Sequence, residues 1–122
     1  MGDPRHLLGL AAEAAVAAWL TDAGWRIVER RARSPSGGEV DLVAIDPDRT
    51  LVAIEVRARR SRRTGSVAAT VDARRVARLG RTLGAIAASG RHPHRALRLD
   101  LVTVEPSEER GKWRLVRVPD IG

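Results

Sequence analysis

The chain has 122 residues, a formal net charge of +7 and a pI of about 11.5, which fit one basic domain that spans 1–122 with a core at about 7–118. The absence of Cys excludes disulfides and thiolate metal sites and fits a reducing compartment, so we expect a cytoplasmic protein. The positive charge favours a polyanionic partner such as nucleic acid, whereas the presence of only three Trp, with no Tyr or Phe, disfavours a base-stacking surface.

A first helix is expected over 7–23, where Ala is abundant and Gly24 provides a stop. Its apolar run is too short to span a bilayer and contains Glu13, so we expect no membrane partner. Glu13 falls on or beside the apolar stripe of this helix, and not on its outer face. It is therefore a candidate site residue, although a Glu at the edge of an amphipathic helix is more often a boundary residue.

A first strand is expected over 25–33, and an acidic hairpin follows it over 38–45 and 51–57. Residues 46–50 are rich in turn formers. If the hairpin is centred on Asp48, Asp41 lies opposite Glu55. Like charges that face each other destabilise a sheet, so this pair needs a cation.

A divalent metal, Mg²⁺ or Mn²⁺, is the natural cation for two opposed carboxylates, because it prefers hard oxygen ligands. Asp41 and Glu55 would hold it, with the backbone carbonyl of Val56 and the carboxylate of Glu13 as further ligands. The same register places Glu39 opposite Arg57. The alternative is that the acids are solvated residues on an open sheet face and that Glu39 and Arg57 form a simple cross-strand ion pair.

Basic residues gather after the hairpin and at the start of a second helix, which is expected over 73–89 with Asp72 as its N-cap. Guanidinium groups there would contact phosphates and position a nucleic acid without reading its sequence. A solvated charged face is the alternative. The proposed contacts are Arg59, Arg60, Arg62, Arg63, Arg74, Arg75 and Arg78.

Two more strands are expected over 96–105 and 113–118, which gives an α/β fold with a mixed sheet flanked by helices, in the order α-β-β-β-α-β-β. His92 and His94 are more typical of ordinary loop histidines than of a metal pair. Asp100 is given a structural or supporting role. No Gly-rich phosphate loop, zinc pattern or nucleophile triad is present.

Several motifs across residues 9–104 resemble the YraN family of small bacterial proteins in order and spacing. They include Gly24-Trp25-Arg26-Ile27-Val28, the two strands of the acidic hairpin, Gly65-Ser66, Arg74-Arg75 and Arg98-Leu99-Asp100-Leu101-Val102. Glu13 stands in the family's Gly-Glu position, with Ala12 replacing the Gly. The resemblance implies a restriction-endonuclease-like fold and a PD-(D/E)XK nuclease core made of Glu13, Asp41, Glu55 and position 57.

The chain departs from the family where Arg57 replaces a Lys. Arg stays protonated, so Arg57 could stabilise charge but could not act as a general base. Three interpretations remain open: a metal-dependent DNA endonuclease, a non-catalytic nucleic-acid-binding protein with a vestigial metal site, and a protein-interaction module with an acidic partner. The oligomeric state also stays open, with a homodimer as one option.

Overall fold

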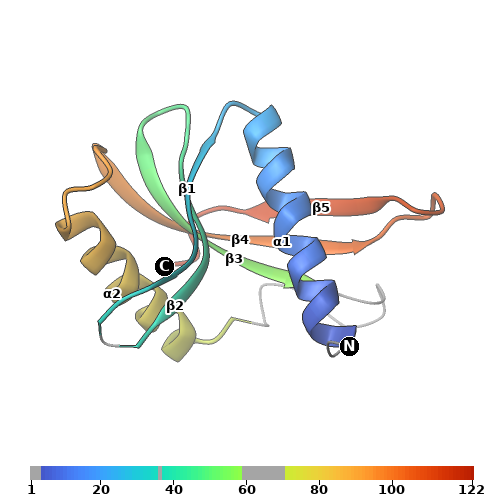
Figure 1. Ribbon diagram of the computed structural model, residues 1–122, viewed down its shortest axis with the longest axis horizontal. Helices are drawn as coiled ribbons and strands as arrows, with labels where there is room; N and C mark the ends of the chain where they lie inside the picture. The colour runs from blue at the N-terminus through green and yellow to red at the C-terminus, as the bar shows by residue number, and fades with distance from the viewer. Residues whose placement is uncertain (1–3, 36, 59–70) are drawn as a thin grey trace.

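The computed structural model describes residues 4–35, 37–58 and 71–122, in which the elements follow the predicted order α-β-β-β-α-β-β (Figure 1). The predicted α/β fold with a mixed sheet and two helices is thus confirmed. The last strand has the predicted bounds, and the first helix begins three residues earlier than expected. The elements are α1 (Pro4–Asp22), β1 (Arg26–Arg33), β2 (Glu39–Ile45), β3 (Thr50–Ala58), α2 (Ala73–Ala88), β4 (Ala96–Pro106) and β5 (Trp113–Val118).

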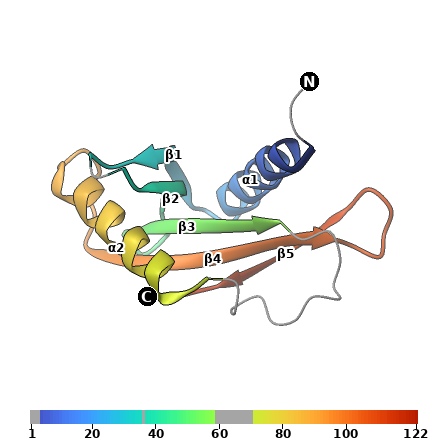
Figure 2. The ribbon, with the colours of Figure 1, turned by 90° about the horizontal axis from the view of Figure 1, so that it is seen from below.

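The five strands form one sheet in the order β1-β2-β3-β4-β5. Neighbouring strands are antiparallel except β3 and β4, which run parallel. Parallel neighbours need a crossover connection, and α2 lies in the crossover between β3 and β4. Figures 1 and 2 show α1 and α2 well apart, with strands between them.

The core has two halves because alternate residues of β2 and β3 point to opposite faces of the sheet. Leu42 and Ile54 pack with α1, whereas Val43 and Ala53 pack with α2. The apolar strands are therefore buried on both faces, as expected for a sheet covered by helices. The buried apolar residues that the two helices contribute are Ala12, Val16, Ala17 and Leu20 from α1, and Leu79, Leu83 and Ile86 from α2.

The turn between β2 and β3 is built on Asp46, whose Oδ1 accepts the N–H groups of Asp48 and Thr50 at 2.9 Å each. Such a side-chain turn is the reason that Asp is favoured at this place. The strands pair from Leu42 opposite Ile54 to the residues beside the turn, which is the register of a hairpin centred on Asp48. The predicted register is thus confirmed over these pairs.

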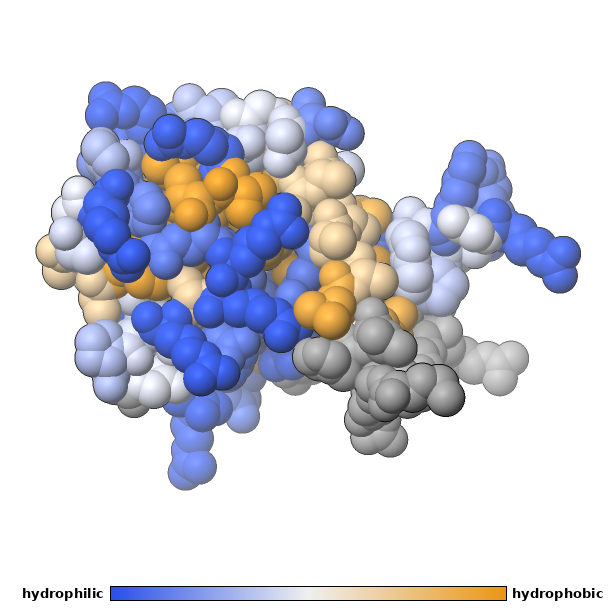
Figure 3. Space-filling model, viewed as in Figure 1, coloured by the Kyte–Doolittle hydropathy of each residue, from blue (hydrophilic) through white to orange (hydrophobic). Residues whose placement is uncertain are grey.

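The second helix begins as predicted, because Asp72 accepts the N–H of Arg75 at 2.8 Å and so caps the helix. Figure 3 shows hydrophilic side chains over much of the face near α2, whereas the Ala-rich α1 forms a paler, more apolar band. In the part of the chain that the structure describes, neither helix is long and apolar enough to cross a membrane.

Candidate functional site

Asp41 lies where β2 separates from β3. The paired residues end at Leu42 opposite Ile54, and beyond this point Asp41 Oδ2 accepts the N–H of Val56 at 2.8 Å. The faces of β2 also change here, since Val40 packs with α2 although Leu42, two residues further on, packs with α1. The side chain of Asp41 therefore bonds to the backbone of the neighbouring strand in place of the sheet ladder.

The strand on the other side of β2 is irregular at the same level. Arg30 pairs with Leu42 and Ala32 pairs with Val40, so Arg31 is the residue opposite Asp41. Arg31 has a φ of 49°, a left-handed conformation that is uncommon outside glycine. β1 and β2 are thus both irregular at the level of Arg31 and Asp41. The pairing of the two strands therefore continues past this point, although the side chains change faces.

Glu55 is the second carboxylate of the site and is only 1% exposed. Burial raises the pKa of Asp41 to about 8, and a hydrogen bond to Glu55 and the charges of Glu55 and Glu13 add to this rise, against the opposing effect of the Val56 N–H. Burial also disfavours the charge of Glu55, but hydrogen bonds from Arg75 and Asp41 outweigh it and lower the pKa of Glu55. The two carboxyl groups therefore interact, and Asp41 is the one that takes up a proton first as the pH falls.

Two arginines neutralise Glu55. Arg75 of α2 places Nε 2.5 Å from Oε2 and Nη2 3.1 Å from Oε1, so one guanidinium contacts both carboxylate oxygens. Arg57, two residues along β3, places Nη2 3.5 Å from Oε2. The Nε of Arg57 is buried and has no hydrogen-bond partner among the described residues. Arg57 is thus held beside Glu55, and its Nε is unpaired among the described residues.

The predicted pairing of Glu39 with Arg57 is wrong. Glu39 pairs instead with Arg33 of β1 at 3.3 Å, and Arg57 pairs with Glu55. The reason is that β2 separates from β3 at Asp41. The pairing of the two strands ends at Leu42 and so does not extend to Glu39 and Arg57.

Glu13 forms an ion pair of its own, although its charge also acts on Asp41. It pairs with Arg31 Nε at 3.2 Å, and its side chain is 17% exposed at the edge of the buried face of α1. Within the described ranges, no three His, Cys, Asp or Glu side chains come together as a set that could hold a metal ion. The structure thus brings together Asp41 and Glu55, and Glu13 as a third ligand stays a prediction.

The residues of the pair fit a hard divalent cation by their chemistry, because carboxylate and backbone carbonyl oxygens are the ligands that Mg²⁺ and Mn²⁺ prefer. Two changes would be needed first. Asp41, whose pKa is raised, would have to be without its proton, and Arg75 would have to release at least one oxygen of Glu55. The carbonyl of Val56 as a ligand remains a prediction.

Among the predicted phosphate contacts, Arg59, Arg60, Arg62 and Arg63 lie outside the described residues. Arg74 and Arg78 are exposed on α2, as phosphate contacts would be. Arg75 is held by Glu55, a contact that the sequence did not indicate. Sequence reasoning also missed Thr82, a buried polar residue on the same helix, because a hydroxyl on an apolar stripe carries no signal of its own.

The other residues that the sequence singled out, two histidines and an aspartate, make contacts within the protein. His92 Nε2 lies 2.6 Å from Glu29, and His94 Nδ1 lies 2.7 Å from the carbonyl oxygen of His92, so neither ring forms a metal pair with the other. Asp100 is fully buried and accepts hydrogen bonds from Arg98, Arg117 and the N–H of Asp120. Asp100 thus holds the C-terminal segment through these bonds, which agrees with the structural role expected of it.

Comparisons with known proteins agree on one family. The model of the uncharacterised protein family UPF0102 matches residues 12–104. A UPF0102 protein of Deinococcus radiodurans is 40% identical over 111 residues, which are 90% of this chain and 89% of the relative. A UPF0102 protein of Moorella thermoacetica is 41% identical over 100 residues, or 82% of each chain. One of Bordetella avium is 37% identical over 108 residues, which are 88% of this chain and 73% of the relative.

Proposed function

This chain belongs to the uncharacterised protein family UPF0102, which is the YraN family that its sequence resembles, and we propose that it binds DNA and hydrolyses its phosphodiester bonds with Mg²⁺ or Mn²⁺. We further propose that its α/β fold is of the restriction-endonuclease-like, PD-(D/E)XK type. The observation that carries the proposal is the pair of Asp41 and Glu55, two acidic side chains that meet at the point where two strands separate, with Glu55 buried and Asp41 bonded to the N–H of Val56.

The pair supports the proposal because it is costly as a purely structural feature. A buried carboxylate opposite another acid destabilises a sheet unless a cation or a proton neutralises it. Asp41 and Glu55 would hold the divalent ion together with the carbonyl oxygen of Val56. Bound there, such an ion supplies a Lewis acid for the phosphoryl oxygen and lowers the pKa of a bound water.

Arg57 would stabilise the negative charge that develops on the phosphate. Its buried and unpaired Nε is a donor with no partner in the described structure, and a phosphate oxygen would provide one. Arg57 stays protonated, so the proton of the attacking water has to go elsewhere. The exposed arginines Arg74 and Arg78 of α2 would contact neighbouring phosphates of the DNA strand without reading its sequence.

A second candidate function, a non-catalytic nucleic-acid-binding protein, is favoured by one observation. Arg75 contacts both oxygens of Glu55, so the position that a metal would take is occupied by a cation that belongs to the chain. The replacement of the family's Lys by Arg57 points the same way. In this case the guanidinium of Arg75 would be the permanent partner of the carboxylate.

The experiment that tests the proposal is a titration of Mg²⁺ and Mn²⁺ followed by a cleavage assay on duplex, branched and single-stranded DNA. We expect metal-dependent products from the parent protein and none from Glu55→Gln or Asp41→Asn, with DNA binding retained in both variants. Two variants are needed, because Glu55→Gln also removes a partner of Arg75. DNA binding without cleavage would favour the second candidate, and the absence of DNA binding would contradict both.

A further inference from the structure

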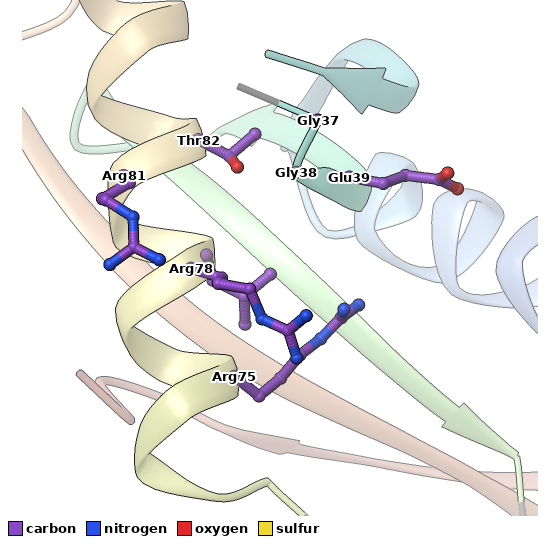
Figure 4. Close-up of a pocket in the computed structure, with 8 residues that line it drawn as sticks. Gly37, Gly38, Glu39, Arg75, Arg78, Arg81 and Thr82 are labelled. Atoms are coloured by element: carbon purple, nitrogen blue, oxygen red, sulfur yellow. The ribbon is translucent and has the colours of Figure 1, made fainter. Parts of the chain in front are cut away.

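A cavity of about 450 Å³ lies between the first half of α2 and the segment that leads into β2. Figure 4 shows Arg75, Arg78 and Arg81 in a row along the helix, with the side chain of Thr82 pointing toward Gly38. Residues three apart on a helix share a side, which explains why three guanidinium groups reach one cavity. The hollow is therefore walled by cations from one element and by a backbone turn from another.

The charges of this cavity are only partly neutralised. Arg75 is paired with Glu55, but neither Arg78 nor Arg81 has an ion pair with any residue that the structure describes. Like charges at this spacing on a helix destabilise it, so an anion placed between them would remove an unfavourable interaction. Glu39 also lines the cavity and its charge acts on Arg75, but its carboxylate pairs with Arg33 and points away from the arginines in Figure 4.

The wall that faces α2 is the backbone around Gly38, which lies close to the helix. A Cβ atom added at Gly38 would lie 2.2 Å from Oγ1 of Thr82, so only glycine allows the backbone here to lie against this hydroxyl. Thr82 is 1% exposed, and its hydroxyl is a small donor at the base of the cavity. The cavity thus combines the planar guanidinium donors of α2 with a buried hydroxyl from the same helix.

The ligand that this chemistry recognises is a tetrahedral oxyanion. Guanidinium groups bind phosphate through paired N–H donors, and several around one hollow favour a group with more than one charged oxygen. None of the described residues that line the cavity is aromatic, so they offer no surface on which a base could stack. The cavity therefore fits the phosphate of a nucleotide strand and not its base.

We propose that this cavity binds one phosphate group of a nucleic-acid strand and that Arg75, which reaches both the cavity and Glu55, makes phosphate binding and divalent-cation binding strengthen each other. The second part rests on the proposed metal site. A phosphate competes with Glu55 for the same guanidinium donors, so phosphate in the cavity loosens the hold of Arg75 on the carboxylate. By linkage, a cation on Glu55 must then favour phosphate in the cavity to the same extent.

The first test measures the thermal midpoint at pH 7 while inorganic phosphate replaces chloride at constant ionic strength. A ligand that binds only the folded state raises this midpoint. We expect a rise in the parent protein and the loss of most of it in Arg78→Gln/Arg81→Gln. The control Arg26→Gln/Arg110→Gln removes two exposed charges that do not line the cavity and should keep the rise. Equal rises in all three proteins would overturn the site.

The second test identifies the source of the phosphate by fluorescence anisotropy with two duplexes, one with 5′-phosphate ends and one with 5′-hydroxyl ends. A preference for phosphorylated ends that Arg78→Gln/Arg81→Gln abolishes assigns a terminal phosphate. Equal affinity, with an equal loss on both duplexes in this variant, assigns a phosphodiester within the strand. A variant that weakens binding no more than the control would show that the cavity takes only small phosphate compounds, which overturns the nucleic-acid part.

The third test measures coupling by titration of Mn²⁺ with and without sulfate, a tetrahedral anion chosen because it sequesters Mn²⁺ less than phosphate does. Sulfate should tighten Mn²⁺ binding several-fold in the parent and not in Arg78→Gln/Arg81→Gln, which keeps both carboxylates. Tightening in neither protein would overturn the coupling. If Mn²⁺ binds to neither protein, the metal site of the proposed function fails, whereas the phosphate result of the first test stands on its own.

Discussion

Arg75 contacts both oxygens of Glu55, with Nε 2.5 Å from Oε2 and Nη2 3.1 Å from Oε1, and so joins α2 to the buried end of β3. Glu55 is 1% exposed, whereas the side chain of Arg75 is 29% exposed. The contact therefore neutralises a charge that water does not reach. It makes Arg75 the residue on which both the stability and the proposed chemistry of the site depend.

Replacement of Arg75 should destabilise the protein. Arg75→Gln leaves Glu55 with Arg57 as its remaining cation, and breaking a buried ion pair by removal of one partner costs about 3–5 kcal/mol when nothing else compensates. Because Arg57 remains and Arg75 is partly exposed, we expect a loss of about 1–3 kcal/mol in the free energy of unfolding by urea. Arg74→Gln, an exposed neighbour on the same helix, is the control and should change it by less than about 0.5 kcal/mol.

Addition of Mn²⁺ should stabilise the parent protein through Asp41. At a metal concentration ten times the dissociation constant, binding to the folded state contributes about 1.4 kcal/mol. This corresponds to a rise on the order of 4 °C in the thermal midpoint for a chain of this size. Asp41→Asn should show no such rise. An equal rise in both proteins would mean that the ion binds elsewhere.

The free energy of unfolding of the metal-free protein should fall as the pH rises from about 4 to about 8. Asp41 has a folded-state pKa of about 8 against an ordinary value of 3.8, so in this window the folded protein holds a proton that the unfolded chain has lost. The stability that this proton provides is fully present below pH 3.8 and is lost as the pH passes through 8.

The slope that Asp41 contributes is at most about 1.4 kcal/mol per pH unit. Urea unfolding at several pH values should show that Asp41→Asn, which cannot titrate, lacks this contribution. Glu55 contributes with the opposite sign, since its lowered pKa adds stability that is lost as the pH falls, so the comparison belongs above about pH 5. A parent and variant with parallel pH dependence there would refute the assignment of the proton to Asp41.

Arg57 distinguishes the two candidate functions. If the chain is a nuclease, Arg57→Lys should raise the rate of Mn²⁺-dependent cleavage, because Lys supplies a compact charge whose pKa can shift, and Arg57→Ala should remove cleavage while circular dichroism shows an intact fold. If the chain only binds nucleic acid, Arg57→Lys leaves cleavage at background. The accompanying change in stability should then be small, about 0.2–1 kcal/mol.

Binding to DNA should weaken steeply with salt. The logarithm of the binding constant falls with the logarithm of the salt concentration, with a slope of about −0.9 for each phosphate contact. Replacement of Arg59, Arg60, Arg62 and Arg63 together by Gln should reduce the slope by about 3–4 if each makes a contact. Fluorescence anisotropy at several salt concentrations measures this, and an affinity that does not change with salt would exclude the electrostatic mode.

The hairpin register could be predicted from the sequence because local chemistry determines it. Asp46 builds the turn, and the apolar residues on either side fix which faces are buried, so Leu42 opposite Ile54 follows from one assumption about the centre. The same reasoning brought Asp41 and Glu55 together correctly. It failed for Glu39, because the separation of the two strands at Asp41 depends on a side chain that bonds to the backbone N–H of Val56.

The contact of Arg75 with Glu55 could not be predicted in the same way. The helical period places Arg75 four residues before Leu79, beside the buried stripe of α2, but it does not show which group of the sheet the guanidinium meets. That partner depends on how α2 sits on the sheet, which is set by the packing of Leu79 and Leu83 with residues of β2 and β3. Contacts of this kind arise from tertiary packing between distant segments.

The link between Glu55 and Arg75 also bears on how the length of this chain can change. It joins residues that lie twenty positions apart in the sequence, so a side-chain contact connects β3 to α2 in addition to the chain between them. The entropy of closing a flexible loop grows only with the logarithm of its length, about 0.6 kcal/mol for each doubling. Insertions can therefore lengthen the connection between β3 and α2 at little thermodynamic cost, as long as the carboxylate of Glu55 and the guanidinium of Arg75 remain.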